Sequence, residues 1–424
     1  MKKQFVYWDT AAEPITTKWY LKPLMWILSA PVAAMHRLKI TKTGMEGVKG
    51  PYVLLCNHNS FFDFQAVTKA IFPQNANYIV AIDAFVGFPG LKWLMQRVGC
   101  IGKRKFTNDV NLIRQSKKVI EKGNVLCIYP EARYSLVGTT AVLPESLGKM
   151  CRMMGVPVVT FMCHGNHINA PCWNQKDRGV KGLEAELKML ITAEELRQLS
   201  VDQINDRIVE AFQYDDYAWQ KEKGVHCRFK GRAEGLHRVL YQCPHCGTEF
   251  EMRSKGDILS CAHCGKRWRM SELGELQAME GNTEFSHIPD WYEWERSNVR
   301  SEVESGSYDS GVLPVRVLTL PDNTPVWLGE GTLQHDMHGF HIKGKTADGE
   351  EFSEDHPVPS KYSCHVEFAY KQYGELLDLS TIKDTWFFSS ADKRFCLTKF
   401  ALATEELYRD YRMKEGKACR PGLA

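Results

Sequence analysis

The sequence lacks a hydrophobic run long enough to cross a bilayer, and it lacks the cysteine density of a disulfide scaffold. Its longest apolar stretch, PLMWILSAPVAAM, occupies residues 23–35, whereas a membrane-spanning helix needs about 20 apolar residues. The first 18 residues are polar and mixed, unlike a secretory signal peptide. The 14 cysteines among 424 residues are too sparse for a disulfide scaffold. These absences exclude a polytopic membrane protein and a disulfide-rich secreted domain, and they indicate an intracellular protein.

The sequence also lacks a large charge of one sign. Its 54 lysines and arginines nearly balance its 51 acids, giving a net charge of +3, so no overall basic field argues for nucleic-acid binding. Apolar residues make up 44% and charged residues 25% of the chain, which is typical of a folded protein and excludes a disordered one. At about 150 residues per domain, the length predicts two or three domains.

The short apolar stretch has aromatic and basic flanks. Trp19 and Tyr20 precede it, Trp26 lies within it, and eight lysines and arginines outnumber three acids over residues 1–50. Such flanks around a short apolar helix are typical of a segment that lies in the headgroup layer of an anionic membrane. We predict that residues 1–37 associate with the cytoplasmic face of a membrane, peripherally or monotopically. The alternative is a buried helix that packs on the following domain.

Short apolar strands alternate with helical periodicity between residues 38 and 165. The predicted strands are 38–43, 52–56, 78–82, 100–103, 125–129 and 157–162, and the predicted helices are 61–71, 91–98, 109–122 and 145–154. This alternation predicts an α/β fold with a mostly parallel sheet flanked by helices. Residues 180–222 are polar and predicted to be helical, with a capping box at Ser200 and Gln203.

A candidate catalytic pair lies where the second predicted strand ends. The strand ends at Cys56 and a helix begins near Phe61, so His58 lies in the loop and Asp63 in the first helical turn. Residues five apart on one continuous helix point in different directions, but a strand-to-helix turn lets the carboxylate reach the imidazole. A carboxylate on one ring nitrogen fixes the tautomer and leaves the other nitrogen as a general base.

At these residues the sequence resembles the glycerolipid acyltransferase family, which acylates glycerol 3-phosphate and 1-acylglycerol 3-phosphate. Asn57, His58 and Asp63 match the family signature Asn-His-x-x-x-x-Asp in full. Three further blocks resemble the family in order, at residues 99–105, 129–135 and 155–159. The resemblance covers residues 40–165. It implies that His58 deprotonates an acceptor hydroxyl, which attacks the thioester of acyl-CoA or acyl-acyl carrier protein without an acyl-enzyme intermediate.

The later blocks supply predicted substrate-binding residues. A phosphomonoester acceptor needs cations, and four lie at or near predicted strand ends, where such sheets bind their ligands: Arg104, Lys105, Arg133 and Lys149. Glu131 is predicted to hydrogen-bond the glycerol hydroxyls or to orient an arginine. Gly102 replaces the family's aromatic residue and Tyr134 replaces its usual arginine. The predicted acceptor is 1-acylglycerol 3-phosphate, and these departures keep another hydroxylated lyso-lipid as the alternative.

Two Cys-x-x-Cys-Gly segments predict a metal site. Cys243 and Cys246 form the first pair, and Cys261 and Cys264 form the second after 14 intervening residues. Each segment is a tight turn that directs two thiolates at one ion, and two such turns complete a tetrahedral zinc site. The segment resembles a rubredoxin-like zinc ribbon. Four thiolates leave no open coordination position, so the predicted zinc is structural.

The remaining chain predicts a β-rich accessory domain. From residue 311 the pattern changes to strands, and it closes with an amphipathic helix, loosely resembling a pleckstrin-homology domain. The predicted domains are the membrane-associating segment 1–37, an acyltransferase domain 38–236, a zinc ribbon 237–275, a helical linker 276–310 and the β-rich domain 311–424. The predicted partners are membrane lipid, the lysophospholipid, the acyl donor and a protein bound by the ribbon or the C-terminal domain. A non-catalytic lipid-binding adaptor is the alternative from another class.

Overall fold

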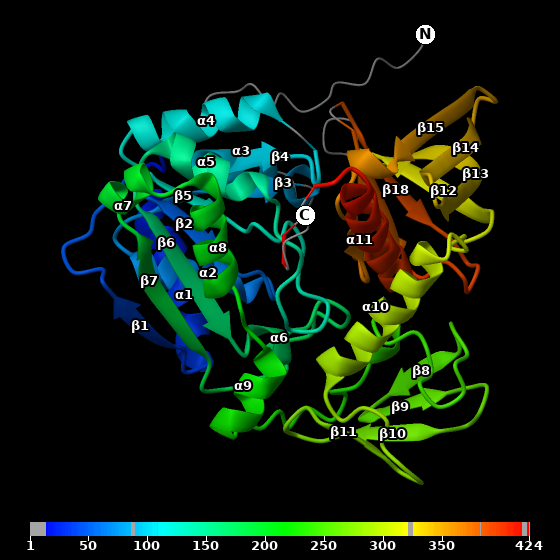
Figure 1. Ribbon diagram of the computed structural model, residues 1–424. Coiled ribbons are helices and arrows are strands. Elements are labelled where there is room, and N and C mark those ends of the chain that lie inside the picture. The colour runs from blue at the N-terminus through cyan, green and yellow to red at the C-terminus, as the bar shows by residue number, and fades with distance from the viewer. Residues whose placement is uncertain are drawn as a thin grey trace.

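The computed structural model describes residues 14–85, 90–107, 109–320, 325–381, 383–417 and 422–423. Figure 1 shows an α/β part on one side of the molecule, a small four-stranded sheet below on the other side, and a larger β part above it. The α/β part comes first in the chain. Residues 1–13 of the predicted membrane-associating segment lie outside the described residues.

A seven-stranded sheet forms the centre of the α/β part, in the order β1-β7-β6-β2-β5-β3-β4. Its neighbouring strands are parallel except for β6 and β7. The strands are β1 (Lys39–Thr43), β2 (Val53–Cys56), β3 (Ala76–Ala81), β4 (Ile101–Lys103), β5 (Val125–Ile128), β6 (Val158–His164) and β7 (Glu184–Ile191). The predicted α/β fold with a mostly parallel sheet is therefore confirmed.

Helices cover both faces of this sheet, which explains why every residue of β2 and β5 is buried. Leu54 and Cys56 of β2 pack into one core with α1 (Leu21–Met35) and α2 (Phe62–Ile71). Val53 and Leu55 point to the opposite face, where the core includes α4 (Val110–Glu121), α5 (Ser146–Met154) and α8 (Val201–Ala211). The other helices here are α3 (Leu91–Arg97), α6 (Asn166–Asn169), α7 (Ala193–Gln198) and α9 (Asp216–Lys223).

The prediction of helix across residues 180–222 is wrong for its first part. Residues 184–191 form β7, which pairs in parallel with β1 and antiparallel with β6. Ala185, Leu187 and Ile191 are buried on one face of this strand, so the chain does carry a two-residue period. Glu, Leu, Lys and Met favour helices locally, but pairing on two sides determines the structure. The predicted capping box of Ser200 and Gln203 does start α8.

Helix α1 contains the predicted apolar stretch, and only one of its faces is covered. Leu21, Met25, Ser29 and Ala33 are buried at four-residue spacing, and α1 packs against α2. Its outer face exposes large apolar side chains, namely Leu24, Trp26, Ile27, Leu28 and Met35. Within the described parts of the chain, every helix is too short or too polar to cross a membrane.

The cysteine-rich segment folds as a four-stranded antiparallel sheet. Its strands are β8 (Met252–Lys255), β9 (Ile258–Cys261), β10 (Arg267–Met270) and β11 (Leu276–Ala278). The long helix α10 (Ile288–Glu304) follows and leads toward the larger β part (Figure 1). Trp268 of β10 is fully buried, and its ring lies 5.0 Å from that of Trp291 in α10. The small sheet is therefore packed onto this helix.

The C-terminal part is a seven-stranded antiparallel sheet closed by a helix, in the order β15-β14-β13-β12-β18-β17-β16. The strands are β12 (Leu313–Thr319), β13 (Val326–Asp336), β14 (Gly339–Thr346), β15 (Glu351–Pro357), β16 (His365–Glu367), β17 (Leu376–Ser380) and β18 (Thr385–Ser389). The last helix, α11 (Leu397–Lys414), packs along α10. The predicted β-rich architecture with a closing helix is confirmed, and its likeness to a pleckstrin-homology domain stays a prediction.

Candidate active site

His58 and Asp63 meet at the turn between β2 and α2. The imidazole Nδ1 lies 3.1 Å from Asp63 Oδ2. Asp63 is fully buried, and its carboxylate also accepts hydrogen bonds from the backbone N–H groups of Asn59 and Ser60 at 2.6 and 2.9 Å. The side-chain amide of Asn166 donates to its other oxygen at 2.6 Å. Because an ionised carboxylate only accepts, His58 Nδ1 carries the proton and Nε2 keeps a free lone pair.

Two further contacts hold the imidazole in place. The His58 ring stacks on Tyr129 with ring centroids 4.2 Å apart, and the Tyr134 ring lies at 4.3 Å on a tilt. The His58 side chain is 23% exposed, so one edge of the imidazole remains open to solvent. Asn57 anchors the loop because its side-chain amide exchanges two 2.8 Å hydrogen bonds with the backbone of Cys163 in β6. The loop is thus tied to the neighbouring strand immediately before the histidine.

Glu131 is hydrogen-bonded to the backbone of the same loop. Its carboxyl group accepts hydrogen bonds from the backbone N–H groups of His58 at 3.0 Å and Ala141 at 2.9 Å. Tyr214 OH lies 3.3 Å from both carboxyl oxygens and donates to Asn59 Oδ1 at 3.0 Å. Glu131 is 1% exposed and lies off the cavity wall described below. The structure therefore brings it to the His58 backbone and not to a position facing a glycerol hydroxyl.

Burial raises the pKa of Glu131 to about 8, which predicts a pH dependence of stability. Between the unfolded value of 4.5 and about 8, the folded protein holds a proton that the unfolded chain releases. The contribution of Glu131 to the free energy of unfolding therefore falls as pH rises through this window, by at most about 1.4 kcal/mol per pH unit. We expect Glu131→Gln to flatten the profile, measured by urea unfolding from pH 5 to pH 8.

The pH dependence of stability that remains in Glu131→Gln provides the control for this measurement. Asp216 is also buried with its pKa raised to about 8, and it is present in both proteins, so the variant profile should be flatter but not level. Parallel profiles for the wild-type protein and Glu131→Gln would show that Glu131 is ionised in the folded state.

A cavity of about 750 Å³ opens beside His58, a size that suits a lipid-like or cofactor-like ligand. One wall comes from the α/β part, including His58, Phe64, Tyr78, Met95, Leu112 and Tyr134. The opposite wall comes from the C-terminal part, including Tyr362, His365, Glu367, Tyr408 and Arg412. His58 therefore faces a largely apolar cavity that two distant parts of the chain build together.

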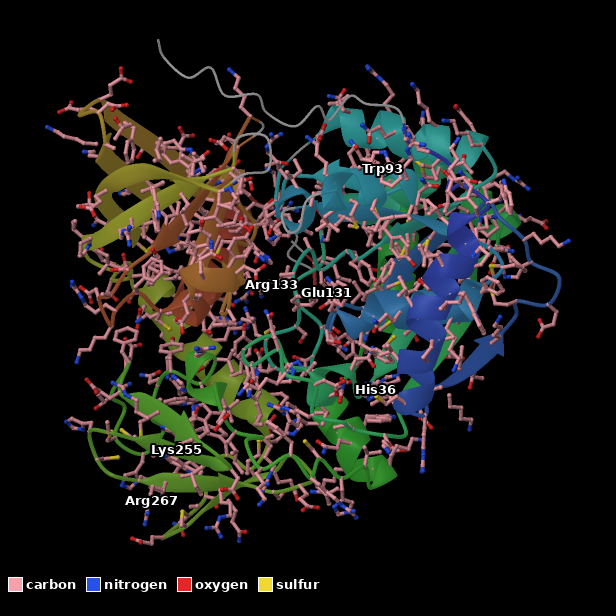
Figure 2. The ribbon with its side chains drawn as sticks, turned by 180° about the vertical axis from the view of Figure 1, so that it is seen from behind. His36, Trp93, Glu131, Arg133, Lys255 and Arg267 are labelled. Carbon is pink, nitrogen blue, oxygen red and sulfur yellow. The ribbon has the colours of Figure 1, made fainter. Side chains whose placement is uncertain are left out.

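Two of the predicted phosphate-binding cations, Lys105 and Arg133, are paired with acids of the α/β part and of the C-terminal part. Lys105 Nζ lies 2.9 Å from Asp83, 3.1 Å from Asp378 and 3.8 Å from Glu367. Although burial lowers the pKa of Lys105, these carboxylates raise it overall. Arg133 Nη2 donates to Glu405 of α11 at 2.6 Å. Both side chains line the cavity, but each is already paired. Figure 2 labels Arg133 and Glu131 in the region between the α/β part and the C-terminal part.

The other two predicted cations lie away from the cavity wall. Arg104 is buried, and its positive charge acts on Asp384 between β17 and β18. Lys149 is exposed on α5 and does not line the cavity formed by the described residues. Of the four cations predicted to bind phosphate, the structure brings only Lys105 and Arg133 to the cavity beside His58.

Sequence reasoning missed two cations that line this cavity, Lys103 and Arg412. Arg412 donates to Glu145 at 2.8 Å, whereas Lys103 makes no ion pair within the described residues. Burial lowers the pKa of Lys103. Lys103 is the last residue of β4, and Lys105 follows two residues later. Because side chains alternate between the two faces of a strand, this spacing was the sequence signal that groups the two lysines and separates them from Arg104.

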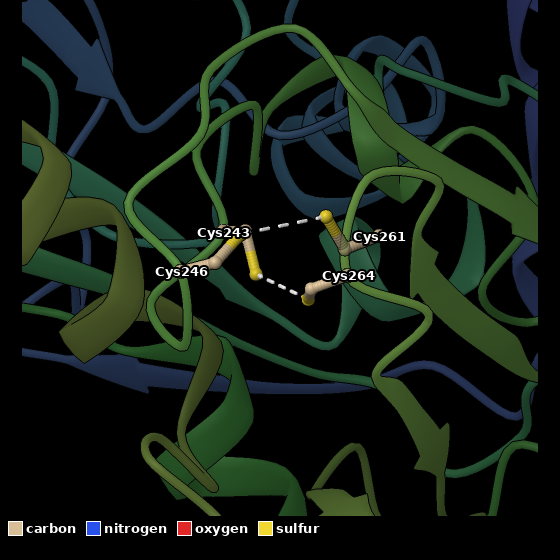
Figure 3. A group of neighbouring side chains, drawn as sticks. All are labelled: Cys243, Cys246, Cys261 and Cys264. Carbon is tan, nitrogen blue, oxygen red and sulfur yellow. Dashed lines mark hydrogen bonds between the residues drawn. The ribbon is translucent and has the colours of Figure 1, made fainter.

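The four predicted metal ligands come together at one point (Figure 3). Their sulfur atoms all lie within 4.8 Å of one another, with Cys243 and Cys264 3.8 Å apart and Cys246 and Cys261 3.9 Å apart. A disulfide would need about 2.05 Å. Zn–S bonds of about 2.3 Å in a tetrahedron place the sulfurs about 3.8 Å apart. The donor set and its spacing are therefore compatible with a structural zinc ion.

Comparison with known proteins finds a family match in the first part of the chain. The family model described as Acyltransferase matches residues 38–164. Among solved structures, the 1-acyl-sn-glycerophosphate (LPA) acyltransferase PlsC from Thermotoga maritima is similar, with 14% identity, a TM-score of 0.38, and coverage of 48% of this chain and 80% of that chain. No curated protein matches the chain. The family match supports an acyltransferase domain that contains β2, the His58 loop and α2.

Proposed function

We propose that the protein is an O-acyltransferase that moves a fatty acyl group from acyl-CoA or acyl-acyl carrier protein to the free hydroxyl of a lysophospholipid. The observation that carries this proposal is the His58–Asp63 hydrogen bond of 3.1 Å at the edge of a largely apolar cavity. The match of residues 38–164 to the acyltransferase family supports the reaction class. His58 is the proposed general base, and Asp63 orients it.

In the proposed reaction, His58 Nε2 removes the proton from the acceptor hydroxyl while Asp63 stabilises the imidazolium that forms. The hydroxyl oxygen attacks the thioester carbonyl, the C–S bond breaks, and the thiolate leaves with the proton returned by His58. Asp63 suits this role because three other donors, from Asn59, Ser60 and Asn166, fix its carboxylate. No serine or cysteine nucleophile takes part.

The acceptor predicted from the sequence is 1-acylglycerol 3-phosphate. Its phosphomonoester would have to displace carboxylates from Lys105 or Arg133, because both are paired in the structure. This pairing specifically favours the second candidate, a lyso-lipid acceptor with a different headgroup.

The assay that tests the function uses the purified full-length protein with both thioester donors and a panel of lyso-lipids in mixed micelles. We expect formation of a diacyl product from at least one acceptor, detected by mass spectrometry, together with stoichiometric release of the donor thiol. Binding of lyso-lipid with no thiol release from any donor and acceptor pair would favour a lipid-binding adaptor.

We also propose that the exposed face of α1 binds the membrane in which the lipid acceptor resides. Ile27 and Leu28 are 58% and 61% exposed, and Trp26 packs on Phe72 with ring centroids 5.6 Å apart. Exposed apolar side chains beside aromatic and basic residues are typical of an interfacial helix.

Replacing both residues in Ile27→Glu/Leu28→Glu should weaken binding to anionic vesicles by 10-fold or more, because burying each apolar side chain contributes about 1.5–3 kcal/mol. Co-sedimentation with phosphatidylglycerol-containing vesicles measures the effect. Val312→Glu, at an exposed apolar position before β12, is the matched control and should bind like the wild-type protein. Equal binding by all three proteins would exclude this face as the membrane contact.

A further inference from the structure

The cavity beside His58 has one unpaired cation and one acidic cluster with spare hydrogen-bond acceptors. Lys103 lines the cavity and makes no ion pair among the residues that the structure describes. A single ammonium group balances a single negative charge, whereas a phosphomonoester carries nearly two. The other cavity-lining cations, Lys105, Arg133 and Arg412, already have carboxylate partners.

The acidic cluster consists of Asp83, Glu367 and Asp378, which surround Lys105. Three carboxyl groups therefore share one lysine. Burial is nearly complete for Asp378, and its Oδ1 has no hydrogen-bond partner. His365, also more than nine-tenths buried, lies 2.7 Å from Glu367 through Nε2, and its Nδ1 has no partner either.

These two unpartnered atoms indicate what is missing from the cluster. In the neutral imidazole whose Nε2 donates to the Glu367 carboxylate, His365 Nδ1 is an acceptor, as is Asp378 Oδ1. Buried acceptors without a donor are rare in folded proteins. Asp83, Glu367 and His365 line the cavity formed by the described residues, whereas Asp378 does not, so a ligand in the cavity can reach the first three of these residues. A group with several N–H donors and a positive charge, which is an ammonium, fits them.

We propose that the acceptor is a lyso-lipid with a zwitterionic headgroup, whose anionic group binds Lys103 and whose ammonium group binds Asp83, Glu367 and His365 at the cavity wall. This inference rests on the proposed acyl transfer and names its acceptor class. Glu367, Asp378 and His365 belong to β16 and β17. The C-terminal part therefore selects the acceptor, and the acyltransferase domain supplies the base.

The experiment compares three acceptors with the same acyl chain and a free hydroxyl: a lysophosphatidylethanolamine, a 1-acylglycerol 3-phosphate and an uncharged monoacylglycerol. We expect kcat/KM of the full-length protein to be about 10-fold or more higher for the zwitterionic acceptor, because a charge-assisted hydrogen bond is worth about that factor. A preference for 1-acylglycerol 3-phosphate that still requires His58 would overturn the inference and leave the proposed function intact.

Two variants test the two ends of the headgroup. Lys103→Ala and Glu367→Gln should each lower kcat/KM for the zwitterionic acceptor about 10-fold and change that for the monoacylglycerol less than 2-fold. The ratio between acceptors does not depend on the folded fraction of a variant. Lys149→Ala, which removes an exposed lysine away from the cavity, is the matched control and should keep the wild-type ratio.

Three other outcomes contradict the proposal. An equal loss with every acceptor in Lys103→Ala would place this lysine at the anionic acyl donor. Asp83, His365 and Glu367 also have ligand atoms within 4.8 Å of one another. A tightly held divalent metal beyond the cysteine site, detected by elemental analysis and lost in Glu367→Gln, would show that the cluster binds a metal ion. Calorimetric titration with a short-chain zwitterionic lyso-lipid reports the binding separately from turnover, and no binding would refute the inference.

Discussion

Replacing His58 with alanine is expected to lower kcat for acyl transfer by about 10²- to 10⁴-fold, the usual contribution of a positioned general base. The His58 imidazole can accept the hydroxyl proton through its free Nε2, since Nδ1 is committed to Asp63. KM for the lyso-lipid should change little, because His58 is one of many cavity-lining residues. Initial rates with saturating donor, followed by thiol release, measure the effect.

Matched variants separate chemistry from folding. Asp63→Asn should also lower kcat, because an amide no longer favours the tautomer with a free Nε2. It also disturbs the backbone N–H groups of Asn59 and Ser60, so its thermal unfolding must be compared. Lys149→Ala should retain full activity. If His58→Ala transfers acyl groups at the wild-type rate while remaining folded, the proposed mechanism is refuted and an adaptor or a different base must be considered.

The sequence predicted the elements around this histidine because each carries a strong local pattern. The four-residue strand β2 is apolar throughout, and α2 begins within one residue of the predicted position. Strand β7 escaped prediction because its residues favour helices, and its conformation depends on pairing with β1 and β6. Local preference decides an element only where tertiary pairing does not oppose it.

The composition of the cavity could not be predicted in the same way. Arg133 and Lys105 were identified as cations, but their partners Glu405 and Asp378 lie more than 270 residues away in the sequence. No local pattern indicates which acid from a separate β part will meet a given lysine. The sequence analysis did not select Lys103, which directly precedes Arg104 and Lys105. The two-residue alternation of a strand would have grouped Lys103 with Lys105 and separated both from Arg104. Charge pairing across distant segments therefore determines which cations remain available for a ligand.

Replacing cysteines of the four-cysteine cluster, the candidate zinc site, should produce the largest change in stability. Structural zinc ions bind to small cysteine sites with apparent free energies of about 10–16 kcal/mol at neutral pH, and this binding contributes to folding. We expect the purified protein to hold one zinc ion per chain, and Cys243→Ser or Cys261→Ser to abolish it. Elemental analysis and differential scanning calorimetry, with and without a chelator, measure the two effects.

The loss should spread beyond the small sheet because the sheet is tied to both long helices. Trp268 packs on Trp291 of α10, and Lys399 of α11 lies 2.8 Å from Glu249, which lies between the two cysteine pairs, and 3.0 Å from Glu302 of α10. Helix α11 also carries Glu405 and Arg412 near the cavity. Zinc removal should therefore expose residues 237–310 to proteolysis. It should also reduce acyl transfer, because the C-terminal wall of the cavity loses part of its support.

His263→Ala removes a nearby imidazole without removing a thiolate, so this variant should keep its zinc and its stability. Loss of zinc in that variant would show that the histidine, not all four cysteines, completes the site.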